Sequence, residues 1–560
     1  MRYLCTIIIS NFQMAKTIIY QIFTRLYGNK NCTRNFNGSI EENGCGKMND
    51  FSPSVLKQLR EMGITHVWFT GVLRHATTTD YSRYGLPPQH PAVVKGRAGS
   101  PYAIVDYYDV DPDLATNVEK RMEEFERLLN RTHRAGLKAI IDFVPNHVAR
   151  QYKSLARPKS VRDLGEDDDP TQGFLPERNN FYYCPGQAFT PYFDLYHGAK
   201  EPYTEMPAKA TGNDHFDNAP GQNDWYETVK LNYGVDYYAG GVGHFSPIPS
   251  TWHKMLDILL FWAAKGVDAF RCDMAEMVPA EFWQWAIEKV KTVHPDVKFI
   301  AEVYNPTQYR RYISFAGFDL LYDKVGMYDT LRDVTCHRRP AEAISWAWQQ
   351  TDDIGRQMLY FLENHDEQRI ASDFFAGEGR KGVPALVVAA LLRENPFMIY
   401  AGQERGERGM DAEGFSGRDG RTTIFDYWSL DTFTRPLSEA EQQLLYIYNK
   451  VLAIARKEET VAEGKMFDLM YANRHLERQF AFLRSSSKWS LLIVANFDDQ
   501  AAETAVTIPA HAFDFLKLSE GNRNAADLLN ETTQQLTLQR DGQVTLRINP
   551  RSAVVLKFNT

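Results

Sequence analysis

Four clusters of polar and charged side chains each follow an apolar run, and together they supply the residue types of paired-carboxylate chemistry. In such chemistry one carboxylate is charged and acts as a nucleophile, while a second is neutral and donates a proton. The clusters close the runs LKAIIDFV, GVDAF, KFIA and QMLYFLE, and they are Asp142 to His147, Arg271 to Asp273, Glu302, and Asn364 to Asp366.

The spacing of these residues suggests how the two roles are divided. Arg271 and Asp273 are two positions apart, so on a strand they share a face, and the guanidinium favours the charged form of Asp273. Glu302 stands between Ala301 and Val303, and we expect an apolar setting and nearby aspartates to raise its pKa. One charged and one neutral carboxylate, about 5–5.5 Å apart, cleave glycosidic bonds with retention of configuration.

An ordinary structural role competes with this interpretation. An aspartate at the end of a strand is often only the cap of the next helix. Four polar clusters in order on successive strands are harder to explain by capping, because capping does not require them to meet. The pattern therefore favours one functional site.

The elements that must position these residues alternate between short apolar runs and amphipathic helical stretches, as parallel βα units do. Val55, Leu59 and Met62 lie on one face of a helix that ends at Gly63, and a second helix is predicted over 117–136. Eight runs are candidate strands of a (β/α)8 TIM barrel, in which catalytic groups lie at the carboxyl ends of strands. They are TIIYQIF, THVWF, LKAIIDFV, GVDAFRCD, KFIAEVY, FDLLYD, QMLYFLEN and PFMIYAGQE.

Two regions depart from this alternation. About one hundred residues after His147 are rich in Tyr, Pro, Gly and Asp without periodicity, which predicts an inserted subdomain after the third strand. Beyond about residue 460 the pattern becomes that of an antiparallel β-sandwich. The predicted division is an N-terminal extension (1–16), a barrel (17–147 and 246–458), an insert (148–245) and a C-terminal domain (459–560).

The segments DFVPNH, GVDAFRCD, FIAEV and ENHD resemble the four signature segments of the α-amylase superfamily, glycoside hydrolase family thirteen, in the family's order. The resemblance extends over most of the chain and includes the insert, the family's domain B, and the C-terminal β-sandwich. It implies that Asp273 is the nucleophile, that Glu302 is the general acid/base and that Asp366 binds and distorts the sugar. It also implies sugar contacts for substrate-binding residues, which are Tyr102, His147, Arg271 and His365.

The resemblance leaves the activity within the family open. TVKLN (228–232) and DMAEMVP (273–279) resemble the neopullulanase and cyclomaltodextrinase branch, whereas typical α-amylases have Lys and His where this chain has Glu276 and Met277. We expect a retaining hydrolase of α-1,4-glucosidic bonds in starch-like glucans or maltooligosaccharides, with α-1,6 or cyclodextrin activity as an extension. A 4-α-glucanotransferase and a non-catalytic carbohydrate-binding homologue are the alternatives.

No cofactor is required by this chemistry, although calcium is compatible with the resemblance. Asn146 matches a position that often ligates calcium, and the Asn-rich loop 28–38 offers oxygen ligands, with an ordinary turn-rich loop as the alternative. Cys272 beside the nucleophile is expected to point into the packing layer.

The net charge and the N-terminal sequence limit the classes of partner that this protein is expected to bind. A formal net charge of -8 argues against nucleic acid as a partner, and the short apolar start MRYLCTIIIS is too short to span a membrane. We expect a soluble protein, cytoplasmic in preference to periplasmic or secreted, whose first 13 residues need not belong to the native chain. The sequence does not predict an oligomeric state.

Overall fold

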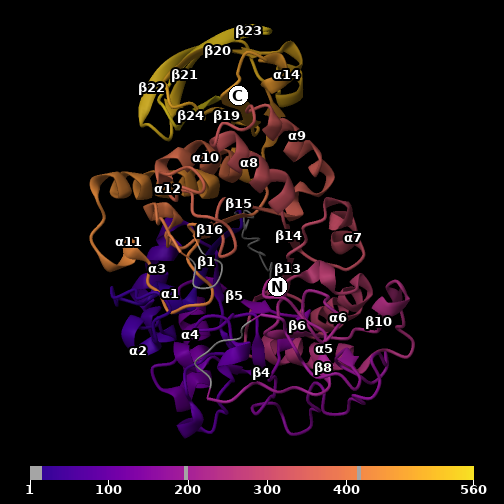
Figure 1. The fold of residues 1–560 in the computed structure, drawn as a ribbon. Helices are drawn as coiled ribbons and strands as arrows, with labels where there is room; N and C mark the ends of the chain where they lie inside the picture. Colours follow the sequence, from indigo (N-terminus) through magenta and orange to yellow (C-terminus); the bar gives the residue numbers. More distant parts are fainter. Residues whose placement is uncertain (1–15, 194–199, 413–417) are drawn as a thin grey trace, which may run out of the picture.

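The barrel strands are the eight apolar runs expected from the sequence. The computed structural model describes residues 16–193, 200–412 and 418–560 (Figure 1). Within this part of the chain, eight parallel strands close into one barrel, each hydrogen-bonded to the next. The strands are β1 (Ile18–Phe23), β2 (His66–Thr70), β5 (Lys138–Phe143), β12 (Ala269–Cys272), β13 (Lys298–Ala301), β14 (Leu320–Tyr322), β15 (Met358–Phe361) and β16 (Phe397–Tyr400). The predicted (β/α)8 barrel is confirmed.

The inside of the barrel is a packed core. Each strand contributes at least one inward side chain to a single buried cluster, because successive residues of a strand point to opposite faces. The cluster includes Ile19, Trp68, Ile140, Ala269, Ile300, Tyr322, Leu359, Phe361 and Met398. The alternate residues face the surrounding helices, and Cys272 is among them, fully buried and turned away from the barrel axis as predicted.

Helices cover the outside of the barrel. α3 (Pro53–Met62) begins at Ser52, whose side chain accepts the N–H of Val55, and ends at Gly63 in the left-handed conformation. The helix predicted over 117–136 begins later, as α4 (Arg121–Arg134), because Val118–Lys120 form a 3-10 turn. The other long helices are α5 (Ser250–Ala264), α6 (Ala280–Val293), α10 (Val383–Leu391) and α12 (Glu439–Lys457).

The region between the third and fourth barrel strands is built of short ladders and long connections. It begins with β6 (His147–Ala149), which pairs with β9 (Thr228–Lys230). The other ladders are β7 (Tyr183–Cys184) with β8 (Ala208–Lys209) and β10 (Val235–Asp236) with β11 (Val242–Gly243). This is the insert that the missing periodicity indicates, and its boundaries stay a prediction.

The C-terminal residues form antiparallel sheets at one end of the molecule, drawn in yellow at the top of Figure 1. The predicted hairpin is β18 (Gln479–Ser485) and β19 (Trp489–Asn496). They belong to a six-stranded sheet with β17 (Lys465–Asp468), β24 (Ser552–Asn559), β21 (Gly521–Asp527) and β22 (Thr532–Leu538), beside a ladder of β20 (Ala502–Ile508) and β23 (Gly542–Ile548).

Residues 1–15, nearly all of the predicted N-terminal extension, lie outside the described residues. Of the helices that are described, none combines the length and the apolar character that crossing a bilayer requires.

Candidate active site

The polar side chains at the open end of the barrel follow from the alternation of its strands. Ala269 and Ile300 fill the barrel interior. Arg271 and Glu302 come two positions later and therefore face the same way, and Asp273 follows two positions after Arg271. The same rule that fills the core thus places charged groups directly above it.

Arg271 is the centre of the charged group. Its guanidinium is fully buried and lies 2.7 Å from Asp273 Oδ1, 2.8 Å from Glu302 Oε2 and 3.5 Å from Asp142 Oδ1. The parallel pairing of β12 with its two neighbours sets these contacts, because it places Arg271 beside Asp142 and Cys272 beside Ala301. Residues that are distant in sequence therefore meet around one cation.

Asp366 joins the group from the loop after β15. Its side chain is 31% exposed, and Oδ2 lies 3.0 Å from His365 Nε2. The His365 ring is fixed on both sides, because its Nδ1 lies 2.7 Å from the Gln21 amide nitrogen and its Nε2 lies 2.5 Å from the Tyr102 hydroxyl. His365 is thus held in position beneath the carboxylate.

One cavity of about 310 Å³ brings the predicted residues together. Asp273, Glu302, Asp366, Tyr102 and His147 all line it. The other two predicted substrate-binding residues, Arg271 and His365, are buried behind the lining residues. Arg271 contacts Asp273, and His365 contacts Asp366.

Several lining residues were not singled out from the sequence. Tyr304 follows Glu302 by two positions, so the strand alternation that identified Arg271 would also have indicated it. Trp225 and Glu227 belong to the aperiodic insert, and Lys95 and Phe425 belong to loops. No sequence pattern points to these four, because only the fold brings their loops to the barrel mouth.

The surroundings of Glu302 differ from the apolar setting expected. Tyr304 donates its hydroxyl proton to Oε1 at 2.7 Å, and the backbone N–H of Met274 donates to Oε2 at 2.8 Å. Arg271 makes its ion pair with the same Oε2. The expectation was wrong because it considered only the sequence neighbours, whereas the contacting groups come from the adjacent strand and from the strand end.

The pKa values of Asp273 and Asp366 are shifted in opposite directions. Burial raises the pKa of Asp273 well above its usual value, and although Arg271 opposes this effect as expected, Glu302 and Asp366 add to it. Desolvation also opposes ionisation of Asp366, but His365 and the charges of Arg271 and Arg421 outweigh it and lower its pKa to about 2. Arg271 is thus the largest influence that favours the charged form of Asp273, against burial and the neighbouring acids.

Two of the aromatic residues that line the cavity, His147 and Tyr102, are neutral. Burial, with the charges of Lys230 and Lys95, lowers the pKa of His147 to about 3. Burial also raises the pKa of Tyr102 well above its ordinary value, and the charge of Asp142 contributes. Both residues therefore meet a ligand as neutral hydrogen-bonding groups.

The contacts of Asn146 do not fit a calcium ligand. Its Oδ1 accepts a hydrogen bond from the Lys230 ammonium at 2.6 Å, and its amide group donates to the Gly212 carbonyl at 2.7 Å. The same ammonium lies 2.5 Å from Asp214 Oδ1. A buried cation of the protein thus occupies the position where calcium would need the oxygen of Asn146, which corrects the expectation for this residue.

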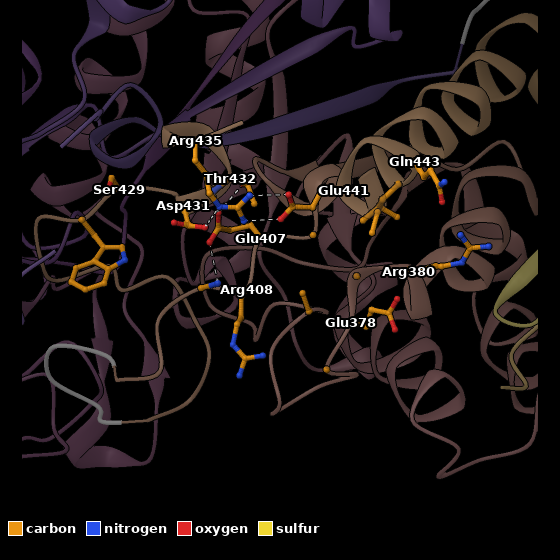
Figure 2. A pocket seen from close by; sticks show the side chains of 18 of the residues that line it. Glu378, Arg380, Glu407, Arg408, Ser429, Asp431, Thr432, Arg435, Glu441 and Gln443 are labelled. Carbon is orange, nitrogen blue, oxygen red and sulfur yellow. Dashed lines mark hydrogen bonds and ion pairs between the residues drawn. The ribbon is translucent and has the colours of Figure 1, made fainter. Parts of the chain in front are cut away.

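A second and larger cavity, of about 500 Å³, lies beside α11 (Asp431–Thr434) and the start of α12, away from the carboxylate group. Figure 2 shows Arg435 between Asp431 and Glu441. Glu407 is buried and accepts hydrogen bonds from the backbone and hydroxyl of Thr432. Asp431 and Glu441 are 46% and 18% exposed, so the two acids around Arg435 lie nearer to solvent than the buried pair around Arg271.

Comparisons with known proteins agree with the architecture. Residues 32–500 match the family profile described as alpha amylase, catalytic domain, and residues 471–559 match alpha amylase, C-terminal all-beta domain. The chain is 23% identical to alpha-amylase 3 of Dictyoglomus thermophilum, over 80% of this chain and 79% of that protein. It is 19% identical to neopullulanase 2 of Thermoactinomyces vulgaris, over 97% of this chain and 77% of that protein.

A solved structure gives the same fold. The maltogenic alpha-amylase AmyB of Thermotoga neapolitana superposes with a TM-score of 0.63 at 20% identity, covering 97% of this chain and 99% of the other. The catalytic-domain profile matches well over half of the sequence. This chain therefore belongs to the α-amylase family of glycoside hydrolases.

Proposed function

We propose that this enzyme hydrolyses α-1,4-glucosidic bonds of starch-like glucans or maltooligosaccharides with retention of anomeric configuration. The observation that carries the proposal is that Asp273, Glu302 and Asp366 line one cavity while Arg271 contacts the first two. Two carboxylates held by the same guanidinium are close together, as the retaining route requires.

In the first step Asp273 attacks the anomeric carbon of the bound glucose unit, and the bond from this carbon to the glycosidic oxygen breaks. Glu302 gives its proton to the departing oxygen, so that the leaving sugar is released as an alcohol. The glycosidic oxygen accepts a hydrogen bond only from protonated Glu302, and positive charge developing on the sugar favours ionised Asp273. Bound substrate thus favours a protonated Glu302 beside an ionised Asp273, with Arg271 in contact with both groups.

In the second step water replaces the leaving group. Glu302, now ionised, takes a proton from the water while the water oxygen attacks the anomeric carbon and displaces Asp273. Both carboxylates return to their starting states. Two displacements at the same carbon give net retention.

The remaining residues hold the sugar. We assign Asp366 to the hydroxyls of the reacting glucose, because its low pKa keeps it charged and His365 fixes its position. Tyr102 offers a ring face at the floor of the cavity, and neutral His147 offers a hydrogen bond. Such groups orient the anomeric carbon toward Asp273.

The motifs TVKLN and DMAEMVP and the likeness to neopullulanase 2 support additional activity on α-1,6 bonds or cyclodextrins. Transfer to a second sugar, as in a 4-α-glucanotransferase, is the other candidate. It is favoured by a hollow of about 550 Å³ that Glu276 and Met277 help to line. These residues follow the nucleophile in sequence, and the hollow has room for an acceptor sugar.

A product profile on starch, pullulan, cyclodextrin and maltotriose tests the proposal, with the anomer of the first products read by NMR. We expect α-anomeric products from starch and from maltotriose. β-Anomeric first products would contradict the retaining assignment. Products longer than maltotriose, formed from maltotriose alone, would favour transfer over hydrolysis.

A further inference from the structure

The two ends of the active-site cavity are built differently, and the end at Glu302 receives the leaving group. Tyr304 and the backbone of Met274 both contact Glu302, so they mark this side. Glu276 accepts the backbone N–H of Tyr304 at 3.1 Å, and it also lines the hollow of about 550 Å³. A second hollow thus lies next to the leaving-group side, with Glu276 and Tyr304 in contact between the two.

Hydrogen bonds join two loops, residues 94–100 and 424–427, in another part of the cavity lining. The carbonyl of Phe425 accepts the backbone N–H groups of Ala98 and Gly99, at 3.0 and 3.1 Å. The guanidinium of Arg25, buried below them, donates to the carbonyls of Gly99 and Ile424. Hydrogen bonds between the two loops and to the barrel thus hold residues 94–100 against residues 424–427.

The two loops approach so closely at Gly96 that no side chain fits between them. Gly96 has a φ of +63°, and a Cβ added to it would stand 2.3 Å from the carbonyl oxygen of Phe425. Only glycine fits at such a position. The two loops therefore form a closed wall, defined here as residues 94–100 and 424–427, with no space for a sugar between them at this point.

The wall presents the charged side chain of Lys95 to the cavity, where it pairs with Glu227 of the insert. Lys95 Nζ lies 3.2 Å from Glu227 Oε2, and the two side chains are 8% and 5% exposed. The Lys95 ammonium also lies 5.5 Å from the ring centroid of Tyr226 and 5.8 Å from that of Phe425. Lys95, Glu227 and Phe425 all line the cavity, so a sugar that reaches the wall meets donors, an acceptor and an aromatic ring.

We propose that this wall closes the glycone side of the active site, so that the enzyme removes short sugars from the non-reducing ends of α-glucans and does not cut within them. The inference rests on the proposed hydrolysis of linear glucans. It excludes activity on cyclodextrins, because a cyclic glucan has no non-reducing end. The two loops of the wall follow β2 and β16, which flank β1, and β1 stands across the closed barrel from β13, which leads into Glu302. The wall therefore lies on the side of the barrel opposite the acid that protonates the leaving group.

Blocking the non-reducing end of a substrate tests the proposal. Maltoheptaose and the same oligosaccharide with a cyclic acetal on O4 and O6 of its terminal glucose are compared, with products separated by chromatography. We expect kcat/KM to be at least about 100-fold lower for the blocked substrate. Equal cleavage of both would overturn the closed wall while leaving the hydrolase assignment intact. Cleavage of neither would overturn the proposed function, and the wall with it.

A variant of the wall sharpens this test. Phe425→Ala removes a ring from the wall, and we expect it to raise the relative rate on the blocked substrate several-fold. Trp346→Ala is the matched control, because Trp346 is an aromatic residue of α9 (Ala343–Gln349) that is 62% exposed and lies outside the cavity lining. An unchanged ratio in Phe425→Ala would contradict the proposal that this wall excludes the blocked end.

Discussion

At the scale of single residues, the site depends on one buried cation shared by several acids. Arg271 contacts Asp142, Asp273 and Glu302, and it lies over the ring faces of Trp68 and Tyr102. A planar guanidinium can meet several acceptors at once, which a lysine ammonium on a flexible stem does less well. One cation can therefore stay in contact with Asp273 and Glu302 while their charges change during the reaction.

The acid role of Glu302 is tested by the leaving group. Glu302→Gln should lower kcat/KM on maltooligosaccharides by about 10²–10⁴-fold, because the departing oxygen no longer receives a proton. With α-maltosyl fluoride, whose fluoride ion leaves without protonation, bond cleavage should be much less affected, as measured by the first burst of fluoride release.

Glu378→Gln, an exposed acid at the larger cavity, is the control and should behave as the wild type on both substrates. If Glu302→Gln slowed bond cleavage equally on both substrates, Glu302 would not be the group that protonates the leaving oxygen.

At the scale of elements, the barrel was predictable and the loops were not. The runs around Ile19, Ile140 and Met398 are apolar on both faces, because one face fills the barrel and the other packs under helices, so length and composition alone identified all eight strands. Phe425 and Lys95 gave no such signal. Their place at the cavity depends on hydrogen bonds between segments more than 300 residues apart in sequence, which no local pattern encodes.

In the active site, too, some features were predictable from the sequence and others were not. The positions of Asp273, Glu302 and Asp366 were predictable, because they follow directly from strands whose carboxyl ends meet at the barrel mouth. The environment of Glu302 was not, because Met274 reaches it from a turn in the left-handed conformation, with a φ of +43°. A contact of this kind depends on the exact path of the backbone after the strand.

The wall is tested at the scale of the loop by a pair of glycine substitutions. Gly96→Ala should destabilise the protein by several kcal/mol, about 1–2 for the left-handed backbone and about 1–3 for the overlap with the Phe425 carbonyl. Gly85→Ala is matched to it, because Gly85 has a φ of +75° but nothing within 4 Å of an added Cβ, so it should show only the backbone cost.

The measurement is the midpoint of thermal unfolding for both variants. Gly96→Ala should also increase the rate on the blocked maltoheptaose relative to the unblocked sugar. Equal midpoints for the two variants would mean that the loops do not approach as closely as described.

At the scale of the whole molecule, the C-terminal sheets are joined to the barrel through a buried charge. Arg484 of β18 donates to the carbonyls of Thr460 and Leu392 and pairs with Glu394 at 3.3 Å. The helix α10 of the barrel packs against β19 and β24. The two parts therefore share an interface that is both apolar and specifically hydrogen-bonded.

Buried neutral histidines should make the whole molecule sensitive to acid. Burial lowers the pKa of His147 and of His75 to about 3, whereas an unfolded histidine titrates near about 6.5. Below about pH 6.5 these histidines bind protons in the unfolded chain but stay neutral in the folded chain. The free energy of unfolding therefore falls as the pH decreases from about 6.5 to about 3. At pH 5 each such histidine should cost about 2 kcal/mol relative to neutral pH.

Chemical denaturation of the wild type and of His147→Gln, between pH 7 and pH 4.5, measures this effect. The variant should lose less stability than the wild type over this range, because the glutamine side chain does not titrate. A parallel decline in both proteins would show that His147 is not held neutral by its surroundings.

Trapping the glycosyl-enzyme intermediate tests the central claim most directly. The protein is incubated with a 5-fluoro-α-glucosyl fluoride, which slows hydrolysis of the intermediate, and is then digested for peptide mass spectrometry. A single covalent sugar on Asp273 is the predicted result, with none in Asp273→Asn. A sugar attached to another carboxylate, or steady turnover of maltooligosaccharides by Asp273→Asn, would contradict the account.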